Sequence, residues 1–470
     1  MTKKKNIIYG LLLGIAIFLI LTMFHYGSDK IIDKVEKENG IQVVKEGYKS
    51  TDTKLTDILK YIDAIYYKED YVREDLYNSA YEEVLKSLDD MYLVNYSKEH
   101  YEDIHHLLEE GYKSSEAKLE DILSFIDIVY FKEELYNSAY EGLLKGLDDP
   151  YTVYFNKKQF ESFMEDTSGS YEGIGAIVSY IKETQEIMIL SPFIGSPAEK
   201  AGLLPGDIIK KVDGEEIKGL ILEEVVANRI KGKKGSKVTL TVYRETDDAN
   251  IDIVITRDVI TMPTISHEML DNKIGYIRVT GFEEATHKQF VKALKELQKQ
   301  GQQGMIIDLR NNPGGLLNIV VKMADELLPK GLIVYTEDKY GRKREEKSDE
   351  AHKFTKPLVV LVNGNSASAS EVLSGAIKDS GIGTIVGTTT FGKGLVQRTF
   401  PLEDGSAIKV TIARYFTPNG NYINKKGIEP DVRVELPEEL KRKLVIEPEK
   451  DTQLKKAIEV LSNLIAKEKK

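Results

Sequence analysis

Short apolar segments alternate with segments of helical periodicity in the C-terminal half of the chain. The apolar runs lie at 305–309, 358–362 and 382–387, and helical patterns follow the first two at 316–328 and 369–378. Strands buried on both faces read as nearly continuous apolar runs, and their alternation with helices is typical of an α/β fold. Such folds place active sites at the carboxyl ends of their strands. The loops that follow these runs are therefore the first candidates for a functional site.

The loop after the first run reads Arg-Asn-Asn-Pro-Gly-Gly at 310–315 and leads into a helix. Its glycines allow several backbone N–H groups to point outward together, which is an anion-binding arrangement. A tight strand-to-helix turn explains the same glycines equally well.

The loop after the second run, 363–371, contains mostly small residues. A serine at the start of a helix lies among unpaired N–H groups that can stabilise an oxyanion. Helix capping by Ser or Asn is the simpler explanation. The spacing alone does not choose among Ser366, Ser368 and Ser370.

The loop after the third run, 387–397, contains G-x-x-x-x-G-K. A phosphate-binding P-loop needs Ser or Thr next, and this chain has Gly394, so nucleotide binding is a weak alternative. Lys393 lies between two glycines and beside Phe391. Desolvation favours the neutral amine of a lysine, and such an amine can act as general base for a serine.

Composition excludes several other chemistries. The chain has no cysteine, so thiol catalysis, disulfides and cysteine-based metal sites are ruled out. With 65 Lys and Arg against 76 Asp and Glu, its net charge of −11 argues against a nucleic-acid partner. None of the seven histidines lies in the three loops, and Glu102-x-x-His105 lacks a matching half for a metal site.

The N-terminal third contains an internal repeat. Three segments occur twice: 46–50 as 110–114, 76–82 as 135–141, and 88–90 as 147–149. Both copies have apolar residues at helical spacing, which predicts a helical hairpin in each. An apolar helix face must be buried on a neighbour, so the repeat indicates interaction rather than chemistry.

The first residues resemble a membrane anchor. Three lysines precede an uncharged apolar run at 7–24, which is just long enough to cross a bilayer. No small-residue cleavage site follows the run. We therefore expect an uncleaved signal anchor, a single pass through the cell membrane, and an extracytoplasmic catalytic part.

A glycine-containing, β-branched region begins near 168 and ends near 258, which predicts a small β domain. The expected strands lie at 176–180, 187–190, 208–212, 237–243 and 251–256.

In their order along the chain, the three loops resemble the carboxy-terminal processing proteases, which are tail-specific serine peptidases of the S41 type that carry a PDZ domain. The resemblance covers about 105–435, and five segments carry it: 311–315, 366–371, 391–397, 417–423 and 426–431. The β domain resembles a PDZ domain at 173–176, 196–203 and 206–209.

The resemblance implies a multidomain α/β fold with N-terminal helical repeats, a PDZ β domain, and a protease core of the ClpP/crotonase-like type. The expected parts are 1–26 as lysines and anchor, 27–165 as the duplicated helical segment, 166–258 as the PDZ domain, 259–435 as the protease core, and 436–470 as a helical tail.

The resemblance also implies a role for individual residues. Ser368 would be the nucleophile, Lys393 the base, and Gln397 the residue that holds the lysine. Backbone N–H groups of Ala369 and of Gly314 or Gly315 would bind the oxyanion.

In the PDZ domain, the loop of Gly173, Ile174, Gly175 and Ala176 would bind the C-terminal carboxylate of a substrate. The family often has a gating arginine before Gly-x-x-Gly. This chain has Lys231 at that place, and Arg229 is a possible substitute.

The expected function is therefore a membrane-anchored serine endopeptidase that recognises proteins by their C-terminal tails. Its expected partners are these substrates, the membrane and a second copy of the chain, with no nucleic acid, cofactor or metal. The alternative from another class is a non-catalytic PDZ scaffold on a protease-like core.

Overall fold

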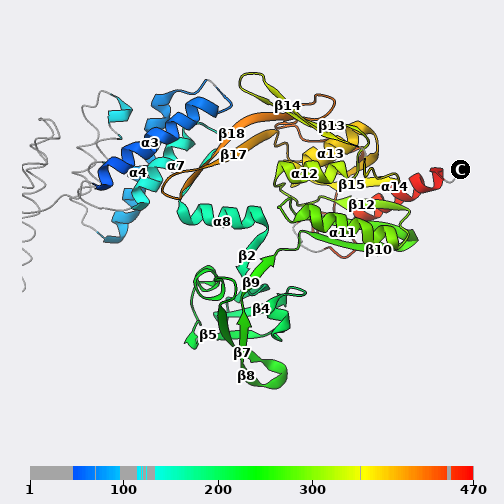
Figure 1. Cartoon of the computed structure of the whole chain (residues 1–470), viewed down its shortest axis with the longest axis horizontal. Helices are drawn as coiled ribbons and strands as arrows, with labels where there is room; N and C mark the ends of the chain where they lie inside the picture. Colours follow the sequence, from blue (N-terminus) through cyan, green and yellow to red (C-terminus); the bar gives the residue numbers. More distant parts are fainter. Residues whose placement is uncertain are drawn as a thin grey trace, which may run out of the picture. The chain divides into compact units, whose positions relative to one another are not determined.

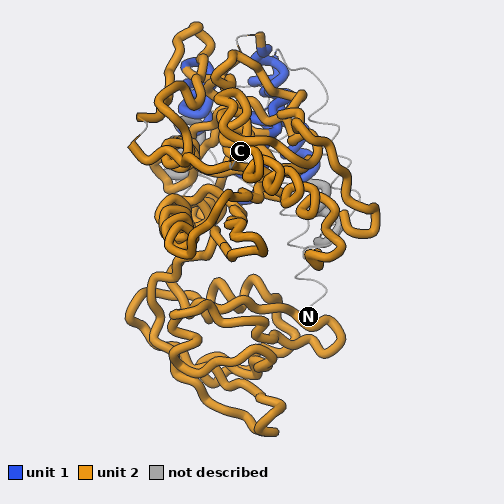
Figure 2. The backbone as a smooth tube through the Cα atoms, turned by 90° about the vertical axis from the view of Figure 1, so that its right-hand side faces the viewer, with its two compact units in different colours: residues 1–64, 71–150 blue, residues 65–70, 151–470 orange. Residues whose placement is uncertain are grey.

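The computed structural model describes residues 46–68, 70–95, 114–117, 119, 123, 133–349, 351–441 and 446–468. The chain divides into two compact units (Figure 2). One comprises residues 1–64 and 71–150, and the other comprises residues 65–70 and 151–470.

The predicted membrane localisation needs correction. No helix within the described ranges combines the length and the apolar character needed to span a bilayer. The predicted anchor at 7–24 lies outside those ranges. A single-pass location with an extracytoplasmic catalytic part thus has no support from the structure, and we do not carry it further.

The first unit contains helices α3 (Glu46–Ile65), α4 (Arg73–Asn95) and α7 (Glu133–Lys145) (Figure 1). Helices α4 and α7 each contain one copy of the recurring segment, and they pack closely. A Cβ atom added to Gly142 of α7 would lie 2.7 Å from the Cα atom of Ala80 in α4. Most of the helix expected at the start of the second copy lies outside the described residues, so the pair of helical hairpins stays a prediction.

The part of the second unit expected to be a PDZ domain contains a sheet in the order β3-β4-β5-β7-β8, with β6 on β5, and a ribbon of β2 and β9. Its strands are β2 (Ser170–Gly173), β3 (Ala176–Ile181), β4 (Glu186–Pro192), β5 (Ile208–Val212), β6 (Glu215–Glu216), β7 (Lys237–Arg244), β8 (Ala249–Thr256) and β9 (Asp258–Thr261). Its helices are α9 (Pro197–Lys200), α10 (Leu222–Val225), η1 (Val226–Ile230) and η2 (Glu245–Asp247). The inward-facing residues of the strands, such as Ile189, Val238 and Leu240, form its apolar core.

The second sheet has the order β10-β11-β12-β15-β16-β19, and all neighbouring pairs from β11 onward are parallel. Its strands are β10 (Ile265–Leu270), β11 (Ile274–Val279), β12 (Gly304–Asp308), β15 (Leu358–Val362), β16 (Gly383–Gly387) and β19 (Val432–Arg433). Its helices are α11 (Thr286–Lys299), α12 (Leu317–Asp325), α13 (Ala369–Ser380) and α14 (Thr452–Glu468), with the short η3 (Asp271–Lys273) between β10 and β11.

Alternate residues of these strands explain how the helices pack. Ile307 and Val360 belong to the apolar cluster of α11, α12 and α13, whereas Ile306 and Val359 belong to the cluster of α14. Successive side chains of a strand point to opposite faces. Helices therefore cover both faces of the sheet, as the continuous apolar runs predict.

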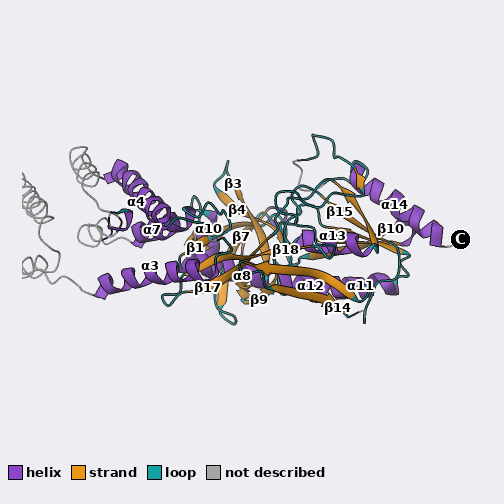
Figure 3. Cartoon of the chain, turned by 90° about the horizontal axis from the view of Figure 1, so that it is seen from above, coloured by secondary structure: helices purple, strands orange, loops and turns teal. Residues whose placement is uncertain are grey.

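A further sheet is antiparallel, in the order β1-β18-β13-β14 with β17 also on β18. Figure 3 shows β17, β18 and β14 of this sheet as strands. Its strands are β1 (Val153–Phe155), β13 (Gly331–Asp338), β14 (Lys343–Ser348), β17 (Leu395–Pro401) and β18 (Ala407–Phe416). Helix α8 (Lys157–Ser168) begins with a capping box formed by Asn156 and Gln159 and ends at Gly169, which has a φ of 65°.

Candidate active site

The three glycine- and serine-containing loops meet at the carboxyl edge of the parallel sheet. Main-chain hydrogen bonds join them: Ala367 N donates to Asn312 O over 3.0 Å, and Phe391 N donates to Ser366 O over 3.1 Å. The parallel order of β12, β15 and β16 brings their three following loops to the same edge. The structure thus brings together the loops from which the sequence predicts a site.

The structure distinguishes the three serines of the second loop. Ser366 and Ser370 are fully buried, and their hydroxyls donate to Leu309 O over 2.8 Å and to Asn312 O over 3.0 Å. Ser368 is half-buried and has a φ of 53° and a ψ of −112° at the start of α13. A non-glycine residue in such a conformation costs about 1–3 kcal/mol and occurs mainly at functional sites. Among the three, Ser368 has the backbone and exposure of a nucleophile.

The predicted oxyanion loop lies directly against Ser368. A Cβ atom added to Gly314, whose φ is 109°, would lie 2.9 Å from Ser368 Cβ and 3.0 Å from Ala369 N. Only glycine permits this approach. The Gly314 N–H donates to Asn312 Oδ1 over 2.8 Å. In this conformation Gly314 therefore has a protein acceptor, and it would have to exchange that bond in order to bind an oxyanion.

A buried carboxylate joins the turn at Ser368 to the loop that contains Lys393. Oxygen Oε2 of Glu371 accepts the N–H of Ser368 over 2.9 Å and the N–H of Lys393 over 2.8 Å. Oxygen Oε1 accepts the Gly392 N–H over 2.7 Å and the Thr390 hydroxyl over 2.6 Å. Glu371 is fully buried. Four donors compensate for the desolvation of its charge.

Sequence reasoning gave Glu371 no role of its own. Its position three residues after Ser368 could have indicated a role, because Ser-x-x-Glu at the start of a helix is a capping-box pattern. The contact with the lysine loop has no local signal, since Glu371 and Lys393 are separated by a strand.

The side chain of Lys393 lies beside an aromatic ring that the loop sequence does not reveal. Its Nζ is 4.3 Å from the ring centroid of Tyr151. A cation at this distance from an aromatic face is stabilised by the ring quadrupole. Phe391, which the sequence placed beside the lysine, has 56 % of its side chain exposed. The aromatic contact of the lysine is therefore made by a distant residue instead.

Tyr415 of β18 contacts the main chain of Ser368. Its hydroxyl donates to Ser368 O over 3.1 Å. Burial, and next the negative charge of Glu371, raise the pKa of Tyr415 well above its usual range. The phenol therefore keeps its proton and remains a donor throughout the physiological range.

Gln397 lies on β17, at a bulge between Val396 and Gln397. Its Nε2 donates to the Thr411 hydroxyl over 3.2 Å, and Thr411 N donates to the Thr152 hydroxyl over 3.1 Å. These contacts fix Gln397 within the antiparallel sheet. Its predicted role in holding Lys393 stays a prediction.

The same contacts argue against the nucleotide alternative. A P-loop binds phosphate through free backbone N–H groups. Here the N–H groups of Gly392 and Lys393 bond to Glu371, and that of Gly394 bonds to Asn424 Oδ1 over 3.2 Å. The buried carboxylate would also repel a phosphate.

The predicted carboxylate-binding loop connects β2 to β3. Ile174 O accepts from Ala198 N and Gly175 O from Phe193 N, each over 2.9 Å. Gly175 has a φ of 79°, and a Cβ atom there would lie 2.6 Å from Ser196 Cβ. The loop is thus fixed by its main chain and by a glycine that no other residue can replace without strain.

The two gating candidates have different partners. Lys231 forms an ion pair with Glu165 of α8, and its Nζ lies 4.9 Å from the ring centroid of Tyr171. Arg229 pairs with Glu215 over 2.5 Å. Of the two, Lys231 therefore links the PDZ segment to the helix that precedes it.

Comparison with known proteins identifies the class. The family model described as peptidase family S41 matches residues 273–434, and the PDZ domain model matches residues 173–255. The first match includes all three loops of the site. This chain belongs to peptidase family S41 and has a PDZ domain, which confirms the family that the loops indicate.

Individual relatives refine that class. The chain is 45% identical over 307 residues to the carboxy-terminal processing protease CtpA of Bacillus subtilis (strain 168), covering 65% of each protein. It is 40% identical over 333 residues to a probable CtpA-like serine protease of Staphylococcus aureus (strain COL), covering 69% of this chain and 66% of that protein. The chain thus spans slightly less than two thirds of these relatives.

Among solved structures, the photosystem II D1 C-terminal processing protease is similar with 30% identity and a TM-score of 0.45, covering 83% of this chain and 95% of that one. The predicted combination of a PDZ domain with a protease core of helices and sheets is confirmed. The ClpP/crotonase-like likeness and the five-part division of the chain stay predictions.

Proposed function

We propose that this protein is a serine endopeptidase that cleaves protein substrates recognised by their C-terminal tails. Ser368 is the nucleophile and Lys393 the general base. One observation supports this proposal most directly: a single oxygen of Glu371 accepts the N–H of both residues. Two segments that are distant in sequence are thereby fixed at one point.

The chemistry follows an acyl-enzyme scheme. The neutral amine of Lys393 takes the proton of the Ser368 hydroxyl as Oγ attacks the carbonyl carbon of the substrate. The N–H groups of Ala369 and of Gly314 or Gly315 stabilise the oxyanion. The ammonium of Lys393 then protonates the departing amine as the peptide C–N bond breaks. Water hydrolyses the ester, and Ser368 regains its proton.

The conformation described here fits a resting state. The Tyr151 ring favours the charged form of Lys393, which cannot accept a proton. The Gly314 N–H is bonded to Asn312 and is not free for substrate. The lysine must lose this preference for its charged form before the scheme above can operate, and the bond to Asn312 must open where Gly314 is the oxyanion donor.

Substrate capture by the PDZ domain supplies a cause for that change. Strand β3 lies at the end of its sheet, so its outer edge can pair with an extended peptide. The peptide carboxylate would then enter the loop at 173–176. Lys231, through its pair with Glu165, is the candidate link between peptide binding and the core.

The predicted homodimer also stays a proposal, and the sedimentation coefficient of the purified chain tests it.

The test uses peptides that differ only in their last residues. The purified full chain is incubated with each peptide, and the products are read by mass spectrometry. We expect cleavage that depends on the C-terminal residues, and no cleavage by Ser368→Ala or Lys393→Ala at unchanged thermal stability. Wild-type activity in both variants would refute the proposal. Peptide binding without turnover by the wild-type chain would favour the PDZ scaffold instead.

A further inference from the structure

The C-terminal helix α14 begins with a carboxylate that has two functions. Oxygen Oδ1 of Asp451 accepts the N–H of Leu454 over 2.9 Å, which caps the helix. The same carboxylate accepts from Arg310, with Nη1 at 2.9 Å from Oδ1 and Nη2 at 2.8 Å from Oδ2. Asp451 is only 3% exposed. Capping alone does not require a buried charge, so the contact with Arg310 needs its own explanation.

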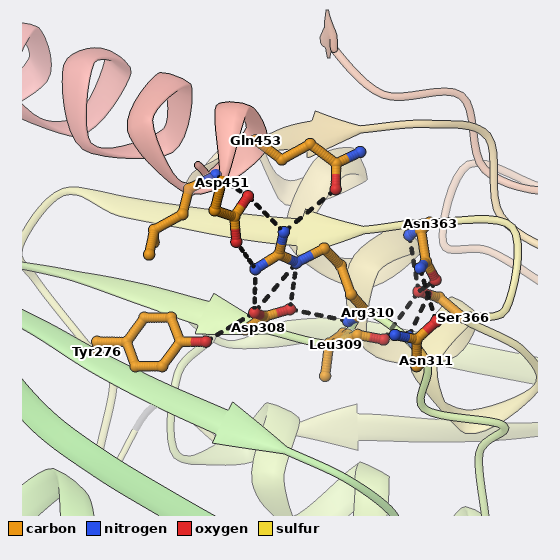
Figure 4. A network of polar contacts seen from close by, with 10 residues as sticks. Tyr276, Asp308, Leu309, Arg310, Asn311, Asn363, Ser366, Asp451 and Gln453 are labelled. Carbon is orange, nitrogen blue, oxygen red and sulfur yellow. Dashed lines mark hydrogen bonds and ion pairs between the residues drawn. The ribbon is translucent and has the colours of Figure 1, made fainter. Parts of the chain in front are cut away.

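A second residue of the same helix turn contacts the same guanidinium. Gln453 Oε1 accepts from Arg310 Nη1 over 3.2 Å, and Gln453 Nε2 donates to Val434 O over 2.8 Å. Figure 4 shows both side chains reaching from the start of α14 toward Arg310. The residue before α14 and its first turn therefore each provide an acceptor for Arg310.

The opposite side of the guanidinium faces Asp308, the last residue of β12. Arg310 Nη2 lies 2.7 Å from Asp308 Oδ2, and Arg310 Nε lies 3.0 Å from Oδ1. The Tyr276 hydroxyl also donates to Asp308 Oδ2 over 2.7 Å. Burial by itself raises the pKa of Asp308, but the charge and hydrogen bonds of Arg310 outweigh it and hold that pKa below its usual range. Arg310 is thus held between two buried carboxylates.

Arg310 is also the first residue of the predicted oxyanion loop. The next residue, Asn311, has a φ of 60°, and its N–H donates to Asn363 Oδ1 over 3.0 Å. Figure 4 shows the side chains of Asn311 and Asn363 on the far side of Arg310 from α14. The chain then passes through Asn312 to Gly314, which lies against Ser368. The position of the Arg310 side chain therefore sets where this loop begins.

We propose that Asp451 and Gln453 are positioning residues of the peptidase: by fixing Arg310 they hold the 310–315 loop in register with Ser368. This inference rests on the proposed function for its catalytic consequence. Removing the charge of Asp451 leaves a buried guanidinium with an incomplete set of acceptors. Arg310 must then shift or draw in water, and the loop shifts with it.

The test compares two variants of α14 in the full chain. Asp451→Asn keeps an oxygen for the N–H of Leu454, and hence the cap, but removes the charge that faces Arg310. Leu461→Ala is the matched control, because Leu461 is fully buried on α14 in the apolar cluster with Ile306 and Val359. The control destabilises the packing of α14 without altering an acceptor of Arg310.

Two measurements distinguish positioning from simple support of the fold. Hydrogen exchange of peptides that contain 309–316 should become faster in Asp451→Asn, whereas Leu461→Ala lowers the melting temperature without this local change. The kcat of Asp451→Asn should fall about 10- to 100-fold with little change in KM, because the loop acts on the transition state. The kcat of Leu461→Ala should stay near that of the wild type.

Unchanged exchange at 309–316 in Asp451→Asn would overturn the inference, as would an equal loss of kcat in Leu461→Ala. A wild-type chain that cleaves nothing, together with faster loop exchange in Asp451→Asn, would refute the proposed function but leave the positioning role intact.

Discussion

The PDZ loop at 173–176 and the turn at Ser368 are both short connections, but they are fixed in different ways. In the PDZ loop, the carbonyls of Ile174 and Gly175 accept from N–H groups of the main chain. At Ser368, N–H groups from two loops converge on the side chain of Glu371. The first arrangement needs only a turn and a glycine. The second depends on a single carboxylate, so one substitution at Glu371 alters four hydrogen bonds of the core at once.

The strongest test of this difference is Glu371→Gln. The amide has one oxygen where four donors need two, so an NH₂ group faces a donor in a buried site. We expect a loss of about 2–4 kcal/mol in the free energy of unfolding. The kcat should fall about 10²- to 10³-fold, as for a lost oxyanion donor. Urea unfolding and peptide-cleavage kinetics measure the two effects.

The matched control is Glu199→Gln in the PDZ domain. Glu199 also accepts a backbone N–H, that of Gly195 over 2.7 Å, but in an exposed site. Its replacement should change stability by less than about 0.5 kcal/mol. Equal effects of the two substitutions would show that the comparison is wrong.

Acid should lower the stability of the protease core more than that of the PDZ domain. Because Arg310 holds the pKa of Asp308 below its usual range, the folded protein binds fewer protons than the unfolded chain near that range. The stability from Asp308 is therefore complete above about pH 4 and is lost as pH falls through the lower, folded pKa. The urea midpoints of wild type and Asp308→Asn should consequently differ by a constant amount above about pH 4 and converge as the pH falls below it.

Asp258, at the start of β9, is the control for this titration. A hydrogen bond from Lys234 lowers its pKa too, but both side chains are exposed. Asp258→Asn should follow the wild type at every pH. If Asp308→Asn does not fold, Tyr276→Phe replaces it, because this variant removes one hydrogen bond to the same carboxylate. Its urea midpoint should show the same dependence on pH with a smaller amplitude. Parallel curves for wild type and both core variants would contradict the expectation.

The smallest expected effect on cleavage comes from the aromatic ring beside Lys393. Tyr151→Leu removes the ring that favours charged Lys393, so cleavage at pH 7 should rise about two- to fivefold, as about 0.5–1 kcal/mol of cation–π energy implies. Tyr151→Phe keeps the ring and should match the wild type. A fall in kcat/KM for Tyr151→Leu with a normal Tyr151→Phe would mean that the ring positions the lysine for catalysis instead.

Periodicity located most of the elements that carry the site. The runs at 305–309 and 358–362 correspond to β12 and β15, and the five expected PDZ strands correspond to β3, β4, β5, β7 and β8. Apolar burial on these strands produces a local pattern that is visible in sequence. The antiparallel sheet had no comparable signal: β14 reads Lys-Arg-Glu-Glu-Lys-Ser and is largely exposed.

The residues of the candidate site also fall into those that the sequence indicates and those that only the fold reveals. Ser368 and Lys393 lie in loops whose composition is unusual by itself, so sequence could single out those loops. The partners that fix them are distant in the chain. Tyr151 contacts Lys393, and Asp451 contacts Arg310, across long distances in the sequence. No spacing rule connects such residues, because tertiary packing alone brings them together.

The close packing of α4 and α7 has a consequence for the history of the duplicated segment. Gly142 of α7 and Gly146, which directly follows α7, lie against the backbone of α4, where any Cβ atom would come within 3 Å of it. The first copy has Glu83 and Ser87 at the corresponding places. The first copy can therefore not substitute for the second: a pair of two α4-like helices would clash at both places. Gene conversion that replaced the second copy by the first would therefore force these helices apart.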